Sequence, residues 1–174
     1  MTTVSSGTLA VSSGQTSDGV IVLSGGQLNV LSGGTILNTF NSGGDELISG
    51  GSSVSAIISA FAVQDIFSGG IASGASIFGT DTLQGVQYID SAGTAVGTIL
   101  NNGGAEDVFS GGTASATLVN SGGELDVESG GWSSASRSTV AAPISCPLAA
   151  QRSARRSAMA ATSSSPGVAA SAPL

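Results

Sequence analysis

The chain has 174 residues, of which 27 are glycine and only 9% are charged, and it contains no histidine. All 11 acidic residues precede Gly131, and all four basic residues, each an arginine, follow it, so residues 1–131 carry a formal charge of −11. A surface this acidic repels nucleic acid and anionic lipid, so we expect neither as a partner. With no histidine and one cysteine, Cys146, a Cys/His zinc site, a Ser-His-Asp triad and an internal disulfide are excluded, and no cofactor is expected.

The N-terminal residues MTTVSSGTLAV have neither the basic segment nor the apolar run of a secretory signal peptide. No apolar stretch reaches the roughly 20 residues of a membrane-spanning helix. We therefore expect no signal peptide in this chain and no direct insertion of the chain into a membrane.

In residues 102–131, one Asn-Gly-Gly and three Ser-Gly-Gly triplets follow one another at spacings of 8, 11 and 8, so that a full unit has 19 residues; similar triplets recur earlier in residues 1–131. Glycine adopts positive φ without a Cβ clash, and a preceding Ser or Asn can hydrogen-bond the turn backbone. We therefore assign a structural turn role to the best-spaced glycines: Gly33, Gly69, Gly103, Gly111, Gly122 and Gly130.

A large apolar residue stands three positions before each turn position, and we call these the anchor residues. They are Val4, Val11, Val22, Val30, Phe40, Leu47, Ile57, Ile66, Ile77, Ile89, Leu100, Val108, Val119 and Val127. The turn position itself departs from glycine at Ala60, Thr80 and Ala92. We expect every anchor residue to face the interior, and the weak turn chemistry from Thr80 to Ala92 predicts a bulge or loop there.

The short arms alternate as strands do: in residues 123–130, Leu125 and Val127 fall on one face, while Glu124, Asp126 and Glu128 fall on the other. An antiparallel sandwich of hairpins does not require one residue type at one phase throughout, but a solenoid does, because each residue packs on its copy in the next rung. The sequence therefore predicts an all-β fold, a parallel β-helix (β-solenoid) of about seven rungs over residues 1–131.

The units SGGxLxVxSGG and SGGTASATLVNSGG resemble the strand-loop-strand passenger repeats of AIDA-type autotransporter adhesins. The resemblance implies a right-handed β-helix displayed outside a bacterial cell, at the cell outer membrane, that mediates cell-surface contact through a receptor or glycan, or self-association. It also implies that Ser and Thr side chains receive heptose, for which the matching positions are Thr98 and Thr117. Similar repeats precede Hedgehog/intein-type domains in secreted bacterial proteins, which is a second resemblance.

From Trp132 the composition changes, because all four prolines and all four arginines lie in residues 132–174. Ala-Ala pairs begin at Ala141, Ala149, Ala160 and Ala169, which continues the rhythm of the glycine pairs, and GGC-GGC read one base later encodes Ala-Ala. We interpret residues 132–174 as the same repeat translated out of frame, and we expect a disordered Ala/Ser/Pro-rich tail.

Acidic residues in the repeat could suggest paired catalytic carboxylates or calcium ligands. We expect a solvated face instead, formed by Glu106, Asp107, Glu124, Asp126 and Glu128. Phe67, Phe109 and Leu31 share the phase after the anchor and form either an outward stripe or a second layer of core. The favoured function is a non-enzymatic adhesin-type passenger fragment without metal or catalytic site; the alternative is a β-helix scaffold of a polysaccharide-active enzyme.

Overall fold

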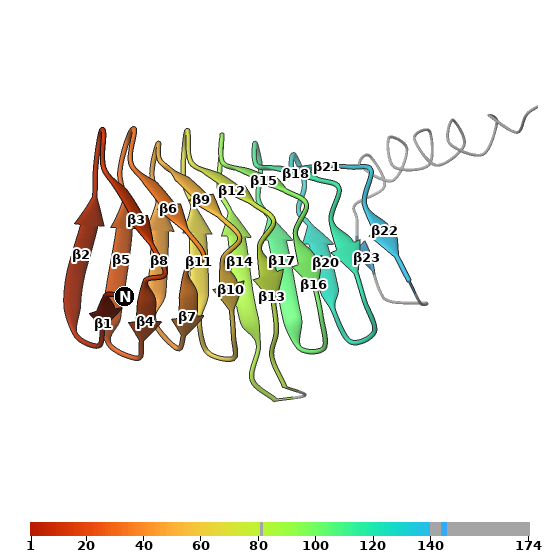
Figure 1. Cartoon of the computed structure of the whole chain (residues 1–174). Helices are drawn as coiled ribbons and strands as arrows, with labels where there is room; N and C mark the ends of the chain where they lie inside the picture. The colour runs from red at the N-terminus through yellow and green to blue at the C-terminus, as the bar shows by residue number, and fades with distance from the viewer. Residues whose placement is uncertain (81, 140–143, 146–174) are drawn as a thin grey trace, which may run out of the picture.

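The chain forms a rod in which the backbone coils around one axis (Figure 1). The structure is a computed structural model, and it describes residues 1–80, 82–139 and 144–145. Each turn of the coil, which we call a rung, contains three short strands, and each strand pairs in parallel with its equivalent in the next rung. The strands therefore stack into three parallel sheets, which confirms the predicted all-β solenoid of about seven rungs.

Three sheets, A, B and C, line the rod. Sheet A contains β1 (Thr3–Val4), β4 (Ile21–Leu23), β7 (Phe40–Ser42), β10 (Ile57–Ile58), β13 (Ser76–Ile77), β16 (Ile99–Leu100), β19 (Leu118–Val119) and β22 (Arg137–Ser138). Sheet B contains β2 (Gly7–Val11), β5 (Gly26–Val30), β8 (Asp45–Ile48), β11 (Val63–Ile66), β14 (Gly85–Ile89), β17 (Gly104–Val108), β20 (Glu124–Val127) and β23 (Ile144–Ser145). Sheet C contains β3 (Thr16–Asp18), β6 (Thr35–Leu37), β9 (Ser52–Val54), β12 (Ile71–Ser73), β15 (Thr94–Val96), β18 (Thr113–Ser115) and β21 (Trp132–Ser134).

Each rung turns three corners, and a residue with positive φ stands at each of them among the described residues, except at the corner that contains the Thr80 loop. The glycine pairs supply two of these corners, and all six glycines to which the sequence assigns a turn role have φ between 68° and 87°. The third corner, between sheets C and A, lies five residues after the second, inside the longer arm of the repeat. Its residues with positive φ are Gly19, Asn38, Ser55, Gly74, Gly97, Ala116 and Ala135.

The second glycine of a pair is required for a different reason, which is close approach between rungs. A Cβ on Gly112 would lie 2.4 Å from the carbonyl oxygen of Ile89, and a Cβ on Gly34 would lie 2.3 Å from that of Val11. No side chain fits between these backbones. The first glycine therefore sets the bend of the chain, and the second permits the rung spacing.

The core is a set of columns of aliphatic side chains, and most of the anchor residues lie in it. The anchors that the structure buries are Val4, Val11, Val22, Val30, Ile66, Ile77, Ile89, Leu100, Val108, Val119 and Val127. Buried Ile36 and small side chains such as Ala72, Ala95 and Ala114 fill the side formed by sheet C. The predicted interior is confirmed at these positions.

The prediction is wrong for three anchors: Phe40 and Ile57 are exposed, and Leu47 is half-buried. The residues in the core are instead Asn41, Ile48 and Ile58, one position later in each case. Val22 pairs with Asn41, and Gln27 pairs with Asp45. Five positions separate Val22 from Gln27 but only four separate Asn41 from Asp45, so the turn after β7 is one residue shorter than the turn after β4. The turn after β8 is one residue shorter than the turn after β5 in the same way. In the next rung the residue with positive φ is Phe61, not Ala60.

The predicted irregularity near Thr80 is a loop. Ile77 pairs with Ile58, and Val86 pairs with Val63. Ile77 and Val86 are nine positions apart, whereas Ile58 and Val63 are five positions apart, so this corner contains additional residues. The extra residues protrude at the corner between sheets A and B, below the rod in Figure 1. The stack is not interrupted, because β14 returns to the register of β11.

The solenoid continues beyond the boundary predicted at Gly131. β21 pairs with β18 through Thr113↔Trp132, and β22 pairs with β19 through Leu118↔Arg137, both at the 19-residue step. Residues 132–138 therefore belong to a further rung and not to a tail. Beyond Thr139 only Ile144 and Ser145 are described, as β23, so the expectations for residues 140–143 and 146–174 lie outside the described residues.

Gly112→Ala tests the close approach between rungs. The new methyl group overlaps a backbone carbonyl that cannot move without breaking the ladder, so we expect a loss of about 3 kcal/mol, the upper end for overpacking. Gly97→Ala is the matched control, because its Cβ would have no neighbour within 4 Å and only its positive φ is costly, by about 1 kcal/mol. Denaturant unfolding followed by circular dichroism measures both losses, and an equal loss in the two variants would contradict the proposed clash.

Candidate functional site

The outer faces of sheets A and B differ in chemistry. Sheet B carries the acidic residues, with Asp65, Asp107, Glu124 and Asp126 pointing outward along its strands. Partial burial, with the charges of Asp90 and Asp45, raises the pKa of Asp65 to about 6. Partial burial also raises the pKa of Asp107, and Asp126, Glu124 and Glu128 add to the shift. Of the five residues predicted to form a solvated acidic face, Asp107, Glu124, Asp126 and Glu128 are exposed or half-buried, in agreement with the prediction.

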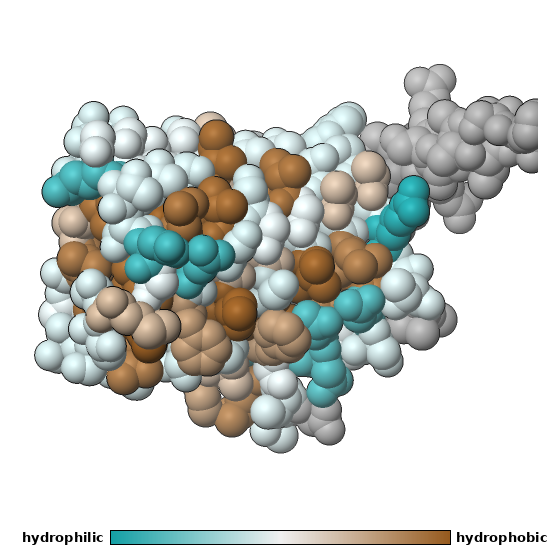
Figure 2. Space-filling view, in the orientation of Figure 1, coloured by the Kyte–Doolittle hydropathy of each residue, from teal (hydrophilic) through white to brown (hydrophobic). Residues whose placement is uncertain are grey.

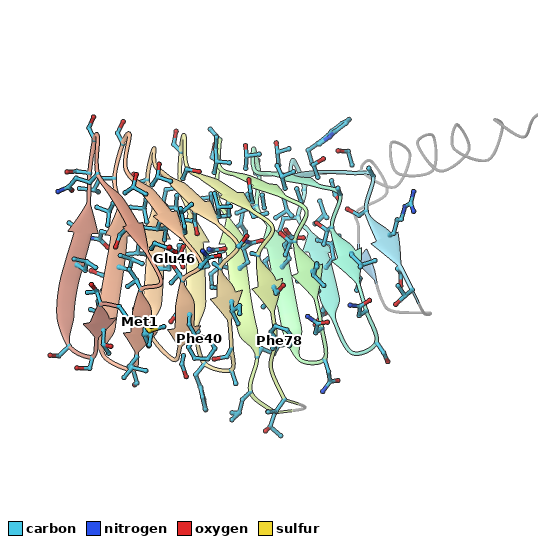
Figure 3. All side chains as sticks on the ribbon, in the orientation of Figure 1. Met1, Phe40, Glu46 and Phe78 are labelled. Atoms are coloured by element: carbon cyan, nitrogen blue, oxygen red, sulfur yellow. The ribbon has the colours of Figure 1, made fainter. Side chains whose placement is uncertain are left out.

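The prediction is wrong for Glu106, whose side chain points into the rod and is fully buried. It pairs in register with Leu125 in the next rung and with Gln87 in the rung before. The same inward column continues through Gln64 to Glu46 (labelled in Figure 3), and then to Leu28. We call Glu46, Gln64, Gln87 and Glu106 the polar column. It occupies four consecutive rungs of a core whose other columns are mostly apolar.

Hydrogen bonds from rung to rung join three of the four residues of the polar column, Glu46, Gln64 and Gln87. Gln64 Nε2 donates to Glu46 Oε1 at 2.9 Å, and Gln87 Nε2 donates to Gln64 Oε1. A parallel stack favours such bonds, because it places equivalent side chains one strand spacing apart. Since each amide has both donors and acceptors, a glutamine can connect the rung before it to the rung after it.

The two carboxyl groups of the column each keep one oxygen without a hydrogen-bond partner in the structure, Oε2 of Glu46 and Oε1 of Glu106. Burial raises the pKa of Glu106 to about 7, against smaller lowering effects from Thr117 and Thr98. Burial likewise raises the pKa of Glu46, against hydrogen bonds from Ser53 and Gln64. The carboxyl group of Glu106 is therefore mostly neutral in the folded rod below about pH 7.

The two predicted heptose acceptors lie inside the rod. Thr98 and Thr117 are each 1% exposed. Thr98 Oγ1 donates to Gln87 Oε1 at 2.9 Å, and Thr117 Oγ1 donates to Glu106 Oε2 at 2.7 Å. The acceptor role expected for them is thus corrected for the folded rod: an enzyme cannot reach these hydroxyl groups, which instead satisfy the buried polar column.

The outer face of sheet A is apolar along most of the rod. Its first outward column runs in register through Thr3, Ile21, Phe40, Ile57, Ser76, Ile99, Leu118 and Arg137. Phe40 and Ile57 are each 41% exposed, and Leu23 and Phe78 lie beside this column. Figure 2 shows brown and tan side chains along this part of the rod, and Figure 3 labels Phe40 and Phe78 at its lower edge.

The stripe considered at Leu31, Phe67 and Phe109 is less continuous. All three residues are exposed, which favours the outward alternative over a second layer of core. However, Ser49 and Asp90 interrupt their column, because these residues take the equivalent positions in the intervening rungs. The rings of Phe109 and Tyr88 lie 5.9 Å apart. The continuous apolar face is that of sheet A.

Within the described ranges, the acidic side chains do not gather in a group of three or more that could hold a metal ion. The same ranges contain no helix with the length and hydropathy needed to cross a membrane.

Residues 78–140, about a third of the chain, match the family model described as AIDA, adhesin of bacterial autotransporter system, probable stalk. The resemblance to AIDA-type passengers is therefore confirmed over these residues. No curated protein matches the chain. Among solved structures, the chain is similar to the crystal structure of a TibC-catalysed, hyperglycosylated fragment of TibA, residues 55–350. The two are 28% identical over 85% of this chain and 74% of that chain, with a TM-score of 0.49.

Glu106→Gln tests the buried carboxyl group. In the unfolded chain Glu106 ionises near its ordinary pKa of 4.5, whereas the folded rod keeps the proton up to about pH 7. The folded state thus binds more protons between these values, so its stability is complete below pH 4.5 and falls as the pH rises to 7, by about 3 kcal/mol for this group. We expect the variant to exceed the wild type in free energy of unfolding by about that amount at pH 8.

The measurement is urea unfolding at pH values from 4.5 to 8. In the variant the free energy of unfolding still falls with rising pH, but by less than in the wild type, because Glu46 and Asp65 also have raised pKa values. Glu124→Gln is the control, since that side chain is exposed on the same sheet and the substitution leaves the interior unchanged. Parallel pH profiles for the wild type and Glu106→Gln would show that this carboxyl group is not protonated in the fold.

Proposed function

Because residues 78–140 match the stalk repeat of bacterial autotransporter adhesins, we propose that this chain is a segment of a surface-displayed passenger rod. In this proposal the rod has no catalytic activity. It mediates contact of the cell with a surface receptor or glycan, or contact between copies of the rod. The parent protein displays it outside the bacterial cell.

The observation that supports the proposal most strongly is the uninterrupted stack. Sheet A holds its register from β1 to β22, through the family-matched segment and beyond it. Each strand between the end rungs is hydrogen-bonded on both sides, so the chain forms a stiff extended body with long, regular outer faces. Such a body is suited to a structural and adhesive role.

The competing proposal is a polysaccharide-active β-helix enzyme. Enzymes that cleave glycosidic bonds place two carboxyl groups in different environments across a bound sugar. Here the outward carboxyl groups of sheet B follow one another in register, as in Asp107↔Asp126, on a regular strand surface. The buried carboxyl groups, Glu46 and Glu106, are enclosed in the core, where a polysaccharide cannot reach them. The geometry therefore favours the adhesive role.

Display of the whole chain on the surface of a non-aggregating bacterium, fused to an unrelated outer-membrane anchor, tests the function. We expect the cells to settle faster or to adhere to cultured cells, relative to cells that carry the anchor alone. Val108→Asp is the matched control, because a charge in the apolar core disrupts the rod without altering an outward residue. Cleavage in a polysaccharide screen without aggregation or adherence would instead favour the enzyme.

A further inference from the structure

We propose that the loop between β13 and β14 forms one wall of a pocket that binds a neutral, hydroxyl-rich ligand, a single saccharide unit. The inference rests on the proposed function, because it names the ligand class and the place on the rod that recognises a surface glycan. The pocket lies at the corner between sheets A and B, beside the loop that protrudes below the rod in Figure 1. The residues that line it are Thr80, Thr82, Gln84, Asn102, Gly103 and Gly122.

The pocket exists because the loop is an insertion. The corner between sheets A and B takes five positions in the preceding rung but nine positions in this one. Gln84 nevertheless stands at the corner beside its equivalent Phe61, since its carbonyl oxygen accepts a hydrogen bond from Phe61 N at 2.9 Å. The additional residues are therefore 80–83, and they project from the rod without changing the register. Insertions in repeat proteins lie on one face, which is often the face that binds a partner.

Hydrogen bonds hold the loop in place against the next rung. Thr80 N donates to Leu83 O at 2.7 Å, and Thr80 Oγ1 accepts from Leu83 N at 3.1 Å, so the loop closes into a tight turn. Before this turn, Gly79 N donates to Asn102 O at 2.8 Å. Thr80 also packs directly on Gly103, where a Cβ would lie 2.5 Å from Thr80 N. The wall of the pocket is thus formed before a ligand arrives, which lowers the ordering cost of binding.

The floor of the pocket is open because glycines form it. Gly103 and Gly122 are the corner residues of the next two rungs, with φ of 68° and 76°, and neither carries a side chain that could fill the space beneath the loop. The side-chain oxygen of Asn102 lies over Gly122, where it would overlap a Cβ. The pocket has a volume of about 400 Å³, within the range of roughly 300 to 1,000 Å³ that is typical of sites for small molecules.

The chemistry of the lining selects the ligand class. Four of the described lining residues present exposed hydroxyl or amide side chains: Thr80, Thr82, Gln84 and Asn102. Hydroxyl and amide groups both donate and accept hydrogen bonds, as the hydroxyl groups around a sugar ring do. The described lining contains no basic residue and the rod is acidic, so a phosphate, sulfate or uronate is repelled. The same lining contains no aliphatic or aromatic residue on which a lipid could pack.

Titration of the purified, isotopically labelled whole chain with sugars, followed by NMR, tests the pocket. The probes are the methyl glycosides of glucose, galactose, mannose and N-acetylglucosamine. We expect at least one of them to bind with a Kd of about 1 mM, in keeping with so small a ligand, and to shift the amide signals of Gln84, Gly103 and Gly122. The uronic acid of the same sugar differs by one carboxylate, and we expect it to bind at least about tenfold more weakly.

Two variants remove the pocket in different ways. Thr82→Val/Gln84→Ala deletes one hydroxyl and one amide of the lining, and we expect at least about tenfold weaker binding. Its matched control is Thr8→Val/Gln27→Ala, which removes the same two groups from sheet B, where they bond to each other at 3.2 Å, and which we expect to bind like the wild type. Deletion of residues 80–83 restores the five-position corner of the preceding rung, and we expect it to keep the circular dichroism spectrum of the rod but to lose binding.

Four results overturn the proposal: no sugar shifts the signals around the pocket, the uronic acid binds as tightly as the neutral sugar, the Thr82/Gln84 variant binds like the wild type, or the sheet B control loses binding equally. None of them depends on the cell-display assay. If displayed cells adhere while no sugar binds, the adhesive function stands and the pocket fails; if a sugar binds while displayed cells neither settle nor adhere, the pocket stands and the adhesive function fails. Presenting the bound sugar on glycolipid vesicles and on a protein carrier then distinguishes the two sources of a surface glycan.

Discussion

The parallel hydrogen bonding between successive rungs is the interaction on which the rest of the structure depends. It places each residue about 4.8 Å from its equivalent in the next rung, so every position of the repeat becomes a column that runs the length of the rod. A residue is then compatible with the fold only if it can stack on its own copies. This requirement explains why Gly112 and Gly34, which lie against a carbonyl of the preceding rung, leave no room for a side chain.

Stacking also explains how a solenoid tolerates a polar interior. In a globular core, a buried glutamine or glutamate needs partners from several elements, and an unsatisfied one is costly. In this rod the equivalent residue one rung away is always within reach, so Gln64 and Gln87 satisfy each other and Glu46 accepts from Gln64. The polar column ends at Glu106, because the next residue in the column is Leu125. Glu106 instead accepts a hydrogen bond from the hydroxyl group of Thr117, which follows the adjacent corner.

The same stacking divides the surface by function. Sheet B gathers carboxyl groups, and partial burial together with their mutual repulsion raises the pKa values of Asp65 and Asp107, while sheet A gathers apolar side chains and one arginine. A rod with faces of such different chemistry can remain soluble through one face and make contacts through another. This division of roles agrees with the description of the family that residues 78–140 match, an adhesin and probable stalk.

The sequence by itself determined the architecture, because the periodic Gly-Gly pairs and the aliphatic residues at constant phase record the stacking directly. It could also identify eleven of the anchors as core residues and place a loop near Thr80. It could not locate the third corner, since Gly, Asn, Ser and Ala all occur there and the bend is held by backbone bonds such as Ala116 N to Ser134 O. Nor could it detect the one-residue turn deletions after β7 and β8, because of which the core residues are Asn41 and Ile48, two positions before the turn glycine and not three.

The candidate sites depended still more on tertiary structure. Asp107 and Glu106 are neighbours in the sequence, but one faces solvent and the other the core, and only the register against Leu125 and Asp126 decides which. Thr98 and Thr117 resemble exposed hydroxyl residues in the sequence, yet the third corner turns both inward onto the polar column. Local spacing thus specified the strands and turns, whereas the alignment of one rung on the next decided which face each side chain occupies.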